Sequence, residues 1–139
     1  MIIALLALAG LFLSWYLWLY KTGAVGTLVC GSGGCESVQF SEYSVFLGVD
    51  VTLIGMLGYL AIAVVAVWGV GPSRADSLAP SIILAGLGGG ALLFTLRLKF
   101  LEFFVIGAVC SWCVVSALLV LAIAVLGWSD LQRVRALSR

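Results

Sequence analysis

The distribution of hydrophobic and polar positions along this 139-residue chain predicts four membrane-spanning helices. Seven basic and six acidic residues leave four long uncharged stretches, which are residues 1–20, 51–73, 77–96 and 103–129. A helix of about 20 apolar residues crosses the hydrocarbon core of a bilayer. Backbone polar groups inside lipid must be satisfied within the protein, so we expect each stretch to be helical. We place the spans at about residues 2–20, 51–71, 79–99 and 109–128.

The predicted fold class is an all-α integral membrane protein. We expect one domain over residues 1–139, a four-transmembrane-helix bundle with an extracytoplasmic loop at residues 21–50. The composition agrees, because 64% of the residues are apolar and only 9% are charged, whereas a soluble domain carries about 25% charged residues. A net charge of +1 provides no basic surface for nucleic acid. The absence of histidine excludes a Ser-His-Asp triad, an HExxH zinc site and a CxxCH haem attachment.

The basic residues predict the orientation in the membrane. The first stretch ends in an aromatic cluster, which is typical of an interface anchor rather than of a signal peptide, so we expect it to be retained. Four spans place both termini on one side, and the positive-inside rule favours the cytoplasm for that side. It would hold Arg74, Arg133, Arg135 and Arg139, against Lys21, Arg97 and Lys99 on the other side.

The candidate chemistry lies in two cysteine pairs, Cys30 with Cys35 and Cys110 with Cys113. In an alternating bundle both pairs fall at the same membrane face, which is the oxidising outside if the termini are cytoplasmic. Residues 110–113 form a CxxC motif where the last helix begins, and the helix N-terminus favours a reactive thiolate. We expect this effect at Cys113. The loop pair encloses only glycine and serine, a flexible segment that suits a disulfide which opens and re-forms.

The four cysteines allow three interpretations. Zinc binding is disfavoured because 74 residues separate the pairs, whereas zinc sites of this type usually have about 15–20. Two inert structural disulfides are an alternative, but a bridge within a CxxC turn is strained and labile. We favour redox-active cysteines and predict no metal. The sequence has no fingerprint for a flavin or nicotinamide and no histidine for haem, so by elimination we expect a lipid-soluble quinone as the electron acceptor. We expect it near an aromatic wall made of Phe94, Phe103, Phe104 and Trp112.

The order of motifs resembles one known family. The chain reads Cys30-x4-Cys35-x2-Val38-x2-Ser41-x-Tyr43, then Gly48-Val49, Gly55-x2-Gly58-Tyr59 and Cys110-x2-Cys113. This order is similar to the vitamin K epoxide reductase family, with the bacterial and archaeal branch as the closer match. The resemblance runs from the first span to the last and implies a prokaryotic cell membrane.

The resemblance implies a four-helix bundle around a quinone of the menaquinone, ubiquinone or phylloquinone type. The loop would form a roof with a short interfacial helix, for which residues 38–47 are the candidate. By resemblance, Cys113 faces the quinone, Cys110 exchanges with Cys35, and Cys30 and Cys35 take electrons from a thioredoxin-like extracytoplasmic partner. The implied quinone-binding residues are Cys113, Ser41, Trp112 and Phe104.

The sequence departs from the family pattern in three places. Asp50 stands where many prokaryotic members have proline. Val51 and Ala117 stand where animal members have asparagine and tyrosine, so polar contacts to the quinone are missing there. The chain ends at Arg139 without the thioredoxin-like domain that many bacterial members carry, so we expect the partner to be a separate protein.

The predicted function is a quinone-coupled thiol–disulfide oxidoreductase that generates disulfides in its partner. One alternative is a vitamin K epoxide or quinone reductase that uses the same four cysteines. The other is a non-catalytic tetraspan protein whose disulfides brace the loop.

Overall fold

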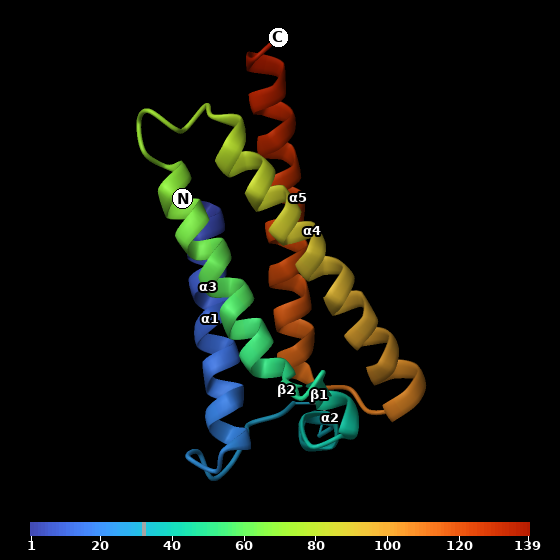
Figure 1. The fold of residues 1–139 in the computed structure, drawn as a ribbon. Helices are drawn as coiled ribbons and strands as arrows, with labels where there is room; N and C mark the ends of the chain where they lie inside the picture. Colours follow the sequence, from blue (N-terminus) through green and yellow to red (C-terminus); the bar gives the residue numbers. More distant parts are fainter. Residues whose placement is uncertain (32) are drawn as a thin grey trace.

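Four long helices run up and down in the computed structural model, which describes residues 1–31 and 33–139 (Figure 1). Helix α1 spans Ile2–Lys21, α3 spans Val51–Gly69, α4 spans Leu78–Leu101 and α5 spans Ser111–Leu137. All four are long and apolar enough to cross a membrane, with α4 counted together with its continuation to Ile106. The predicted four-helix membrane bundle is confirmed. One residue of the predicted flexible segment, Ser32, lies outside the described residues.

The helix starts match the prediction more closely than the helix ends do. Each helix begins within two residues of its predicted start. The last helix does not end near residue 128 but continues to Leu137, because Leu131 and Val134 are buried along its polar end. Helix α4 passes into a π-helical turn at Glu102–Ile106, which ends at Gly107 in the left-handed conformation with φ 70°. Glycine adopts this conformation without the steric cost that a Cβ brings.

The segment between α1 and α3, residues 22–50, is called the cysteine loop below. It contains helix α2 at Cys35–Gln39, a 3-10 turn at Glu42–Ser44 and two short strands, β1 at Val45–Phe46 and β2 at Val49–Asp50. The strands pair antiparallel, with Phe46 opposite Val49. Leu47 and Gly48 join them with φ values of 52° and 80°, as a two-residue type I′ turn requires.

The prediction of a helix at residues 38–47 is therefore wrong. A short helix is present in the cysteine loop, but it covers Cys35–Gln39 and ends before Ser41, whose backbone is extended at φ −70° and ψ 157°. The apolar residues that suggested a longer helix divide among three elements: Phe40 ends α2, Tyr43 lies in the 3-10 turn and Leu47 lies in the turn of the hairpin.

The helices pack mainly as two pairs, α1 with α3 and α4 with α5. Glycines allow the close approach in both pairs. A Cβ added at Gly10 of α1 would overlap the ring of Tyr59 on α3, and one at Gly88 of α4 would lie 3.1 Å from Cα of Ala124 on α5. Among the glycines of α4, Gly88 makes this close contact, whereas a Cβ at Gly86, Gly89 or Gly90 would meet open space.

Both chain ends lie away from the cysteine loop. Figure 1 shows the N and C labels toward the end of the bundle that also carries the connection between α3 and α4. Arg133 of α5 contacts that connection through an ion pair with Asp76 at 3.2 Å and a hydrogen bond to the carbonyl of Ala75 at 3.2 Å. The α2 helix and the β1–β2 hairpin lie at the opposite end. This arrangement agrees with the expectation that both termini share one membrane side.

Candidate redox site

Helix α5 begins at the CxxC motif, and Cys110 is its N-cap residue. The backbone N–H of Cys113 donates to Cys110 Sγ at 3.4 Å. A sulfur at this position receives an unpaired N–H of the first turn and the partial positive charge of the helix N-terminus. Hydrogen bonds from the Cys113 side chain and backbone lower the pKa of Cys110 to about 7, although burial opposes them. The helix-terminus effect that the sequence assigned to Cys113 therefore acts on Cys110.

The other two cysteines form a disulfide in the cysteine loop. Cys30 and Cys35 are joined with a Cα–Cα distance of 6.1 Å, while Cys110 and Cys113 are free thiols. The structure thus holds one disulfide and one dithiol rather than the two disulfides of the bracing interpretation. Cys35 starts helix α2 and is buried, as is Cys110.

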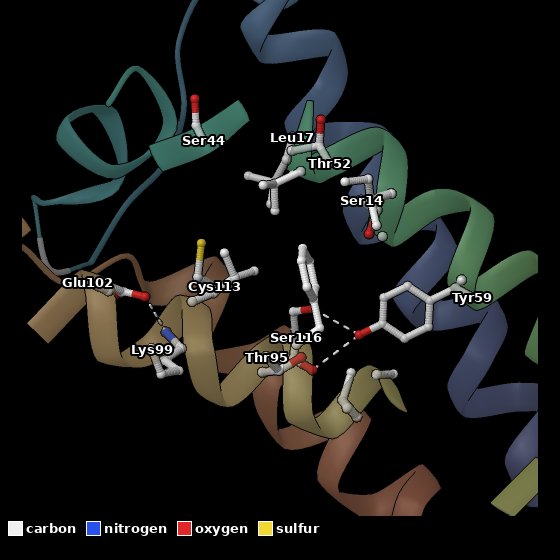
Figure 2. A pocket seen from close by; sticks show the side chains of 18 of the residues that line it. Ser14, Leu17, Ser44, Thr52, Tyr59, Thr95, Lys99, Glu102, Cys113 and Ser116 are labelled. Atoms are coloured by element: carbon white, nitrogen blue, oxygen red, sulfur yellow. Dashed lines mark hydrogen bonds and ion pairs between the residues drawn. The ribbon is translucent and has the colours of Figure 1, made fainter. Parts of the chain in front are cut away.

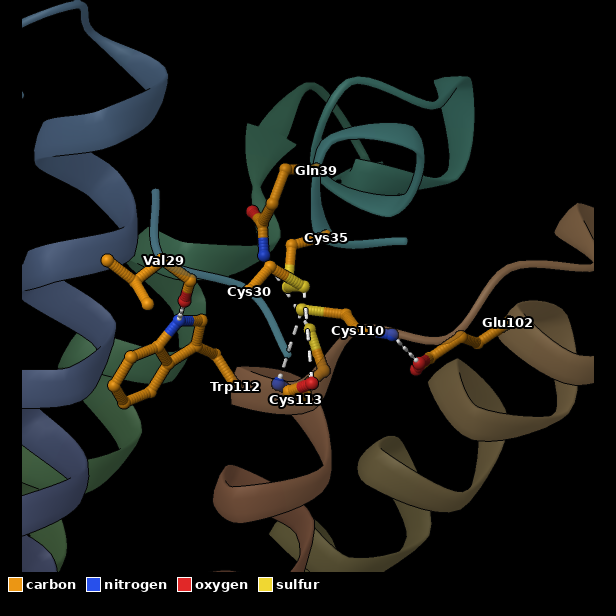
Figure 3. Close-up of a disulfide and its surroundings, with 9 residues drawn as sticks. Val29, Cys30, Cys35, Gln39, Glu102, Cys110, Trp112 and Cys113 are labelled. Carbon is orange, nitrogen blue, oxygen red and sulfur yellow. Dashed lines mark hydrogen bonds between the residues drawn. A yellow bond between two sulfur atoms is a disulfide. The ribbon is translucent and has the colours of Figure 1, made fainter. Parts of the chain in front are cut away.

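The cysteine loop lies directly on the start of α5. Gly34 precedes Cys35, and a Cβ at Gly34 would overlap the backbone of Val109, which precedes Cys110. Trp112 Nε1 donates to the carbonyl of Val29 at 2.6 Å. These contacts bring all four cysteines into one group, as Figure 3 shows.

Polar side chains complete the surroundings of the sulfurs. Gln39 Nε2 donates to Cys113 Sγ at 3.6 Å, and Ser111 Oγ lies 4.0 Å from Cys30 Sγ. In the described residues, 1–31 and 33–139, no cluster of three or more potential metal ligands is found.

A buried carboxylate supports Cys110 from the other side. Glu102, in the π-helical turn, is only 2% exposed. Its Oε1 accepts the backbone N–H of Cys110 at 2.6 Å (Figure 3). Its Oε2 accepts from Lys99 Nζ at 2.6 Å (Figure 2). The sequence analysis missed this pair. The available signal was that Glu102 is the one acidic residue between positions 77 and 129, and an ionisable residue within a membrane span is a functional candidate.

A cavity of about 420 Å³ lies between the helices beside Cys113. Its size falls within the usual range of ligand pockets, about 300–1,000 Å³. Apolar side chains from all four long helices make most of its wall. Of the four cysteines, Cys113 lines the cavity. Figure 2 shows the polar and sulfur groups that face it, which include Ser14, Ser44, Thr52, Tyr59, Thr95, Lys99, Glu102, Cys113 and Ser116.

These residues fit a quinone, which is an apolar ring with two hydrogen-bonding oxygens. The hydroxyl of Tyr59 is fixed at the cavity by Ser116, with 2.8 Å between Tyr59 Oη and Ser116 Oγ. Its ring is packed against Gly10. Lys99 provides a charged donor near Cys113 (Figure 2). The wall therefore combines apolar surface with a few placed polar groups, as ligand pockets do.

The predicted quinone contacts divide into two groups. Ser41 and Cys113 line the cavity, and so do Phe94 and Val51. Phe103 and Phe104, by contrast, are 54% and 77% exposed, because the π-helical turn directs them outward. Neither they nor Trp112 and Ala117 belong to the cavity lining.

Trp112 has a different position from the one expected. Its indole packs edge-on against Tyr16 of α1, with ring centroids 5.6 Å apart, and donates to Val29 of the cysteine loop. It thus contacts the loop rather than the cavity. We therefore leave Trp112 and Phe104 out of the proposed quinone contacts.

Asp50 has a structural role where many relatives carry proline. Its carboxylate caps α3 by accepting from the backbone N–H of Thr52 at 2.8 Å and from its hydroxyl at 2.6 Å. It also forms a 2.5 Å ion pair with Lys21 at the end of α1. Burial alone would raise the pKa of Asp50, but the bonds from Lys21 and Thr52 outweigh it and lower the pKa. Asp50 thereby fixes Thr52 at the cavity wall.

A membrane bundle that holds a loop disulfide over a helix-capping dithiol defines a membrane thiol–disulfide redox protein. Comparison with protein families agrees with this class. Residues 1–128 match the Vitamin K epoxide reductase family, and the chain belongs to that family.

Proposed function

We propose that this protein is a quinone-coupled thiol–disulfide oxidoreductase that generates disulfides in a thioredoxin-like partner. We place it in a prokaryotic cell membrane, with both termini cytoplasmic and the four cysteines outside. One observation carries the proposal: the Cys30–Cys35 disulfide lies on the free Cys110 and Cys113 thiols, and Cys113 in turn lines the apolar cavity. Electrons can therefore pass from the loop pair to the CxxC pair and on to a ligand in the cavity.

The first exchange takes place at the loop. A thiolate of the reduced partner attacks the Cys30–Cys35 bond, and the second partner thiol resolves the mixed disulfide. The partner leaves with a disulfide, and Cys30 and Cys35 become thiols. The flexible glycines around the pair allow this opening.

The second exchange takes place between the pairs. Cys35 attacks Cys110 of an oxidised Cys110–Cys113 pair and frees Cys113. Cys30 then attacks Cys35, which re-forms the loop disulfide and frees Cys110. The N-cap contact from the Cys113 N–H favours this step because it stabilises Cys110 as a leaving thiolate. The result is one loop disulfide and two free thiols, the arrangement that the structure contains.

The final step oxidises Cys110 and Cys113 at the cavity. A bound quinone supplies an acceptor for two electrons and two protons. Cys113 lies at the cavity wall with Gln39 donating to its sulfur. The Cys110–Cys113 disulfide then re-forms.

The test is reconstitution of the purified protein in lipid with a reduced thioredoxin-like protein and a quinone. We expect stoichiometric loss of partner thiols and quinone. Changing any one of the four cysteines to serine should abolish the coupled reaction. Ser129→Ala, at an exposed position, is the matched control and should retain the reaction. Loss of quinone without loss of partner thiols would contradict the proposal, as would reduction of a vitamin K epoxide in place of partner oxidation.

A further inference from the structure

Lys99 and Glu102 form an ion pair in the cavity wall that the electron path above does not use. Lys99 Nζ lies 2.6 Å from Glu102 Oε2, and the two side chains are only 16% and 3% exposed. Both residues line the cavity with Cys113 (Figure 2). Lys99 and Glu102 are the charged residues among the described residues that line the cavity. A charged pair at this depth is costly in free energy and marks a functional position.

The pair is connected to the dithiol. The second oxygen of Glu102, Oε1, accepts the backbone N–H of Cys110 at 2.6 Å. One carboxylate thus holds the start of the CxxC turn with one oxygen and the ammonium group with the other. Glu102 begins the π-helical turn Glu102–Ile106, and such turns are frequent at functional sites. The geometry thus holds Lys99 at the cavity wall, which Cys113 also lines.

Oxidation of the dithiol needs a route for protons as well as electrons. Two thiols release two protons when they form a disulfide, and a quinone takes up two when it is reduced. Delivering electrons alone would leave an uncompensated charge in an apolar cavity, which is strongly unfavourable. The chain has no histidine to carry the proton.

The other titratable groups at the cavity are less suited to this task. They are Cys113 itself, Glu102, Tyr43 and Tyr59, with Cys110 next to Glu102. Tyr59 already bonds with Ser116, and the carboxylate of Glu102 is occupied on both oxygens. Tyr43 is 37% exposed, which leaves Lys99, with a side chain only 16% exposed, as the enclosed group with protons to donate.

We propose that Lys99 donates a proton to the electron acceptor while Cys110 and Cys113 are oxidised, with Glu102 as its positioning residue. This inference rests on the proposed function. As the Cys110–Cys113 bond forms, two electrons leave the sulfurs for a quinone in the cavity. Lys99 Nζ gives one proton to a quinone oxygen and regains one from a cysteine thiol. The second thiol proton goes to water, and water supplies the second proton to the acceptor, so the charge of the site is unchanged.

Arginine at position 99 separates donation from ion pairing. A guanidinium group still pairs with Glu102 but does not release its proton. We expect Lys99→Arg to lower quinone turnover about 100-fold, within the usual contribution of a general acid. It should still bind quinone, measured as protection of Cys113 from alkylation. In Lys99→Ala, small primary amines should restore turnover with rates that depend on the basicity of the amine.

Arg97 offers the matched control, since it lies two positions away, packs over the ring of Phe46 and does not line the cavity. Arg97→Ala should turn over at the wild-type rate. Wild-type turnover in Lys99→Arg, or loss of quinone protection in that variant, would overturn the proton-donor role and leave the proposed function intact. Failure of the wild-type protein to reduce quinone would instead overturn the proposed function, and this inference with it.

Discussion

Gly34 of the cysteine loop lies directly against the backbone of Val109, one residue before each of the two buried cysteines Cys35 and Cys110. A Cβ at position 34 would overlap the Val109 carbonyl and amide. The backbone of Gly34 is in the right-handed helical region, at φ −94° and ψ −2°, so alanine is excluded here by space rather than by conformation. The close approach of the two cysteine pairs therefore depends on the absence of a side chain at this position.

Gly34→Ala tests this contact. We expect the loop to move away from α5 and the exchange between Cys35 and Cys110 to slow at least tenfold, which corresponds to about 1.4 kcal/mol. Formation of the mixed disulfide, followed by mass spectrometry after rapid acid quench, measures the rate. Gly31→Ala is the control, because its Cβ would meet only Ser111 Oγ at an ordinary 3.7 Å. Equal rates in the two variants would refute the steric argument.

The order of electron transfer predicts the products of cysteine removal. In Cys113→Ala the remaining Cys110 thiolate attacks Cys35, so a Cys35–Cys110 disulfide should accumulate with Cys30 as a free thiol. Peptide mapping under non-reducing conditions detects this bond. Cys110→Ala should retain Cys30–Cys35, since Cys113 lines the cavity and the proposed exchange with Cys35 takes place at Cys110. A Cys35–Cys113 bond in the Cys110 variant would reverse the assigned roles.

Sequence patterns predicted the four helices and the pairing of the cysteine groups for clear physical reasons. Long uncharged stretches have few alternatives to spanning helices, and alternation then brings residues 30–35 and 110–113 to one end. The π-helical turn was not predictable in this way, because it depends on how Glu102 is satisfied by Lys99 and Cys110. It turns Phe103 and Phe104 outward, so an aromatic residue close to Cys113 in sequence is not close to the cavity.

The cysteine loop was also predicted poorly in detail. Residues 38–47 divide among the end of α2, a 3-10 turn and the start of the β1–β2 hairpin, and apolar spacing alone did not reveal the breaks between them. The position of Trp112 follows from a carbonyl that lies 83 residues away in the sequence, that of Val29. No local pattern contains such a contact.

The N-cap position of Cys110 predicts its titration. In a variant with Cys30, Cys35 and Cys113 all changed to serine, Cys110 is the single thiol and has no cysteine in the chain to pair with. With Cys113 present, hydrogen bonding lowers the pKa of Cys110 to about 7, below the value of about 8.5 for a free cysteine. The backbone N–H of residue 113 remains as a donor in the variant, so the thiolate should form at a lower pH than that of a free cysteine and be lost as the pH falls further. Its ultraviolet absorbance, taken as a difference from the variant with all four cysteines changed to serine, measures the titration curve, and a midpoint at or above that of free cysteine would contradict the cap.

Removing the negative charge at Glu102 should shift this curve further. The carboxylate opposes the thiolate at Cys110 by charge repulsion, the smallest of the influences on its pKa. Glu102→Gln keeps an oxygen acceptor for the Cys110 N–H but removes the charge. We expect a lower midpoint when Glu102→Gln is added to the variant that retains only Cys110 than in that variant alone. A higher midpoint would mean that the carboxylate supports the thiolate instead.

The indole of Trp112 provides the last prediction, because its hydrogen bond holds the loop while its ring stays outside the cavity. Trp112→Phe retains an aromatic ring for contact with Tyr16 but loses the donor to the Val29 carbonyl. We expect exchange between the cysteine pairs to slow about tenfold, since the loop is held less firmly, while quinone protects Cys113 from alkylation as in the wild type. Trp128→Phe, an exposed position on α5 outside the cavity lining, serves as the control. If Trp112→Phe instead loses quinone protection at an unchanged exchange rate, then Trp112 is a quinone contact, as its sequence position had suggested.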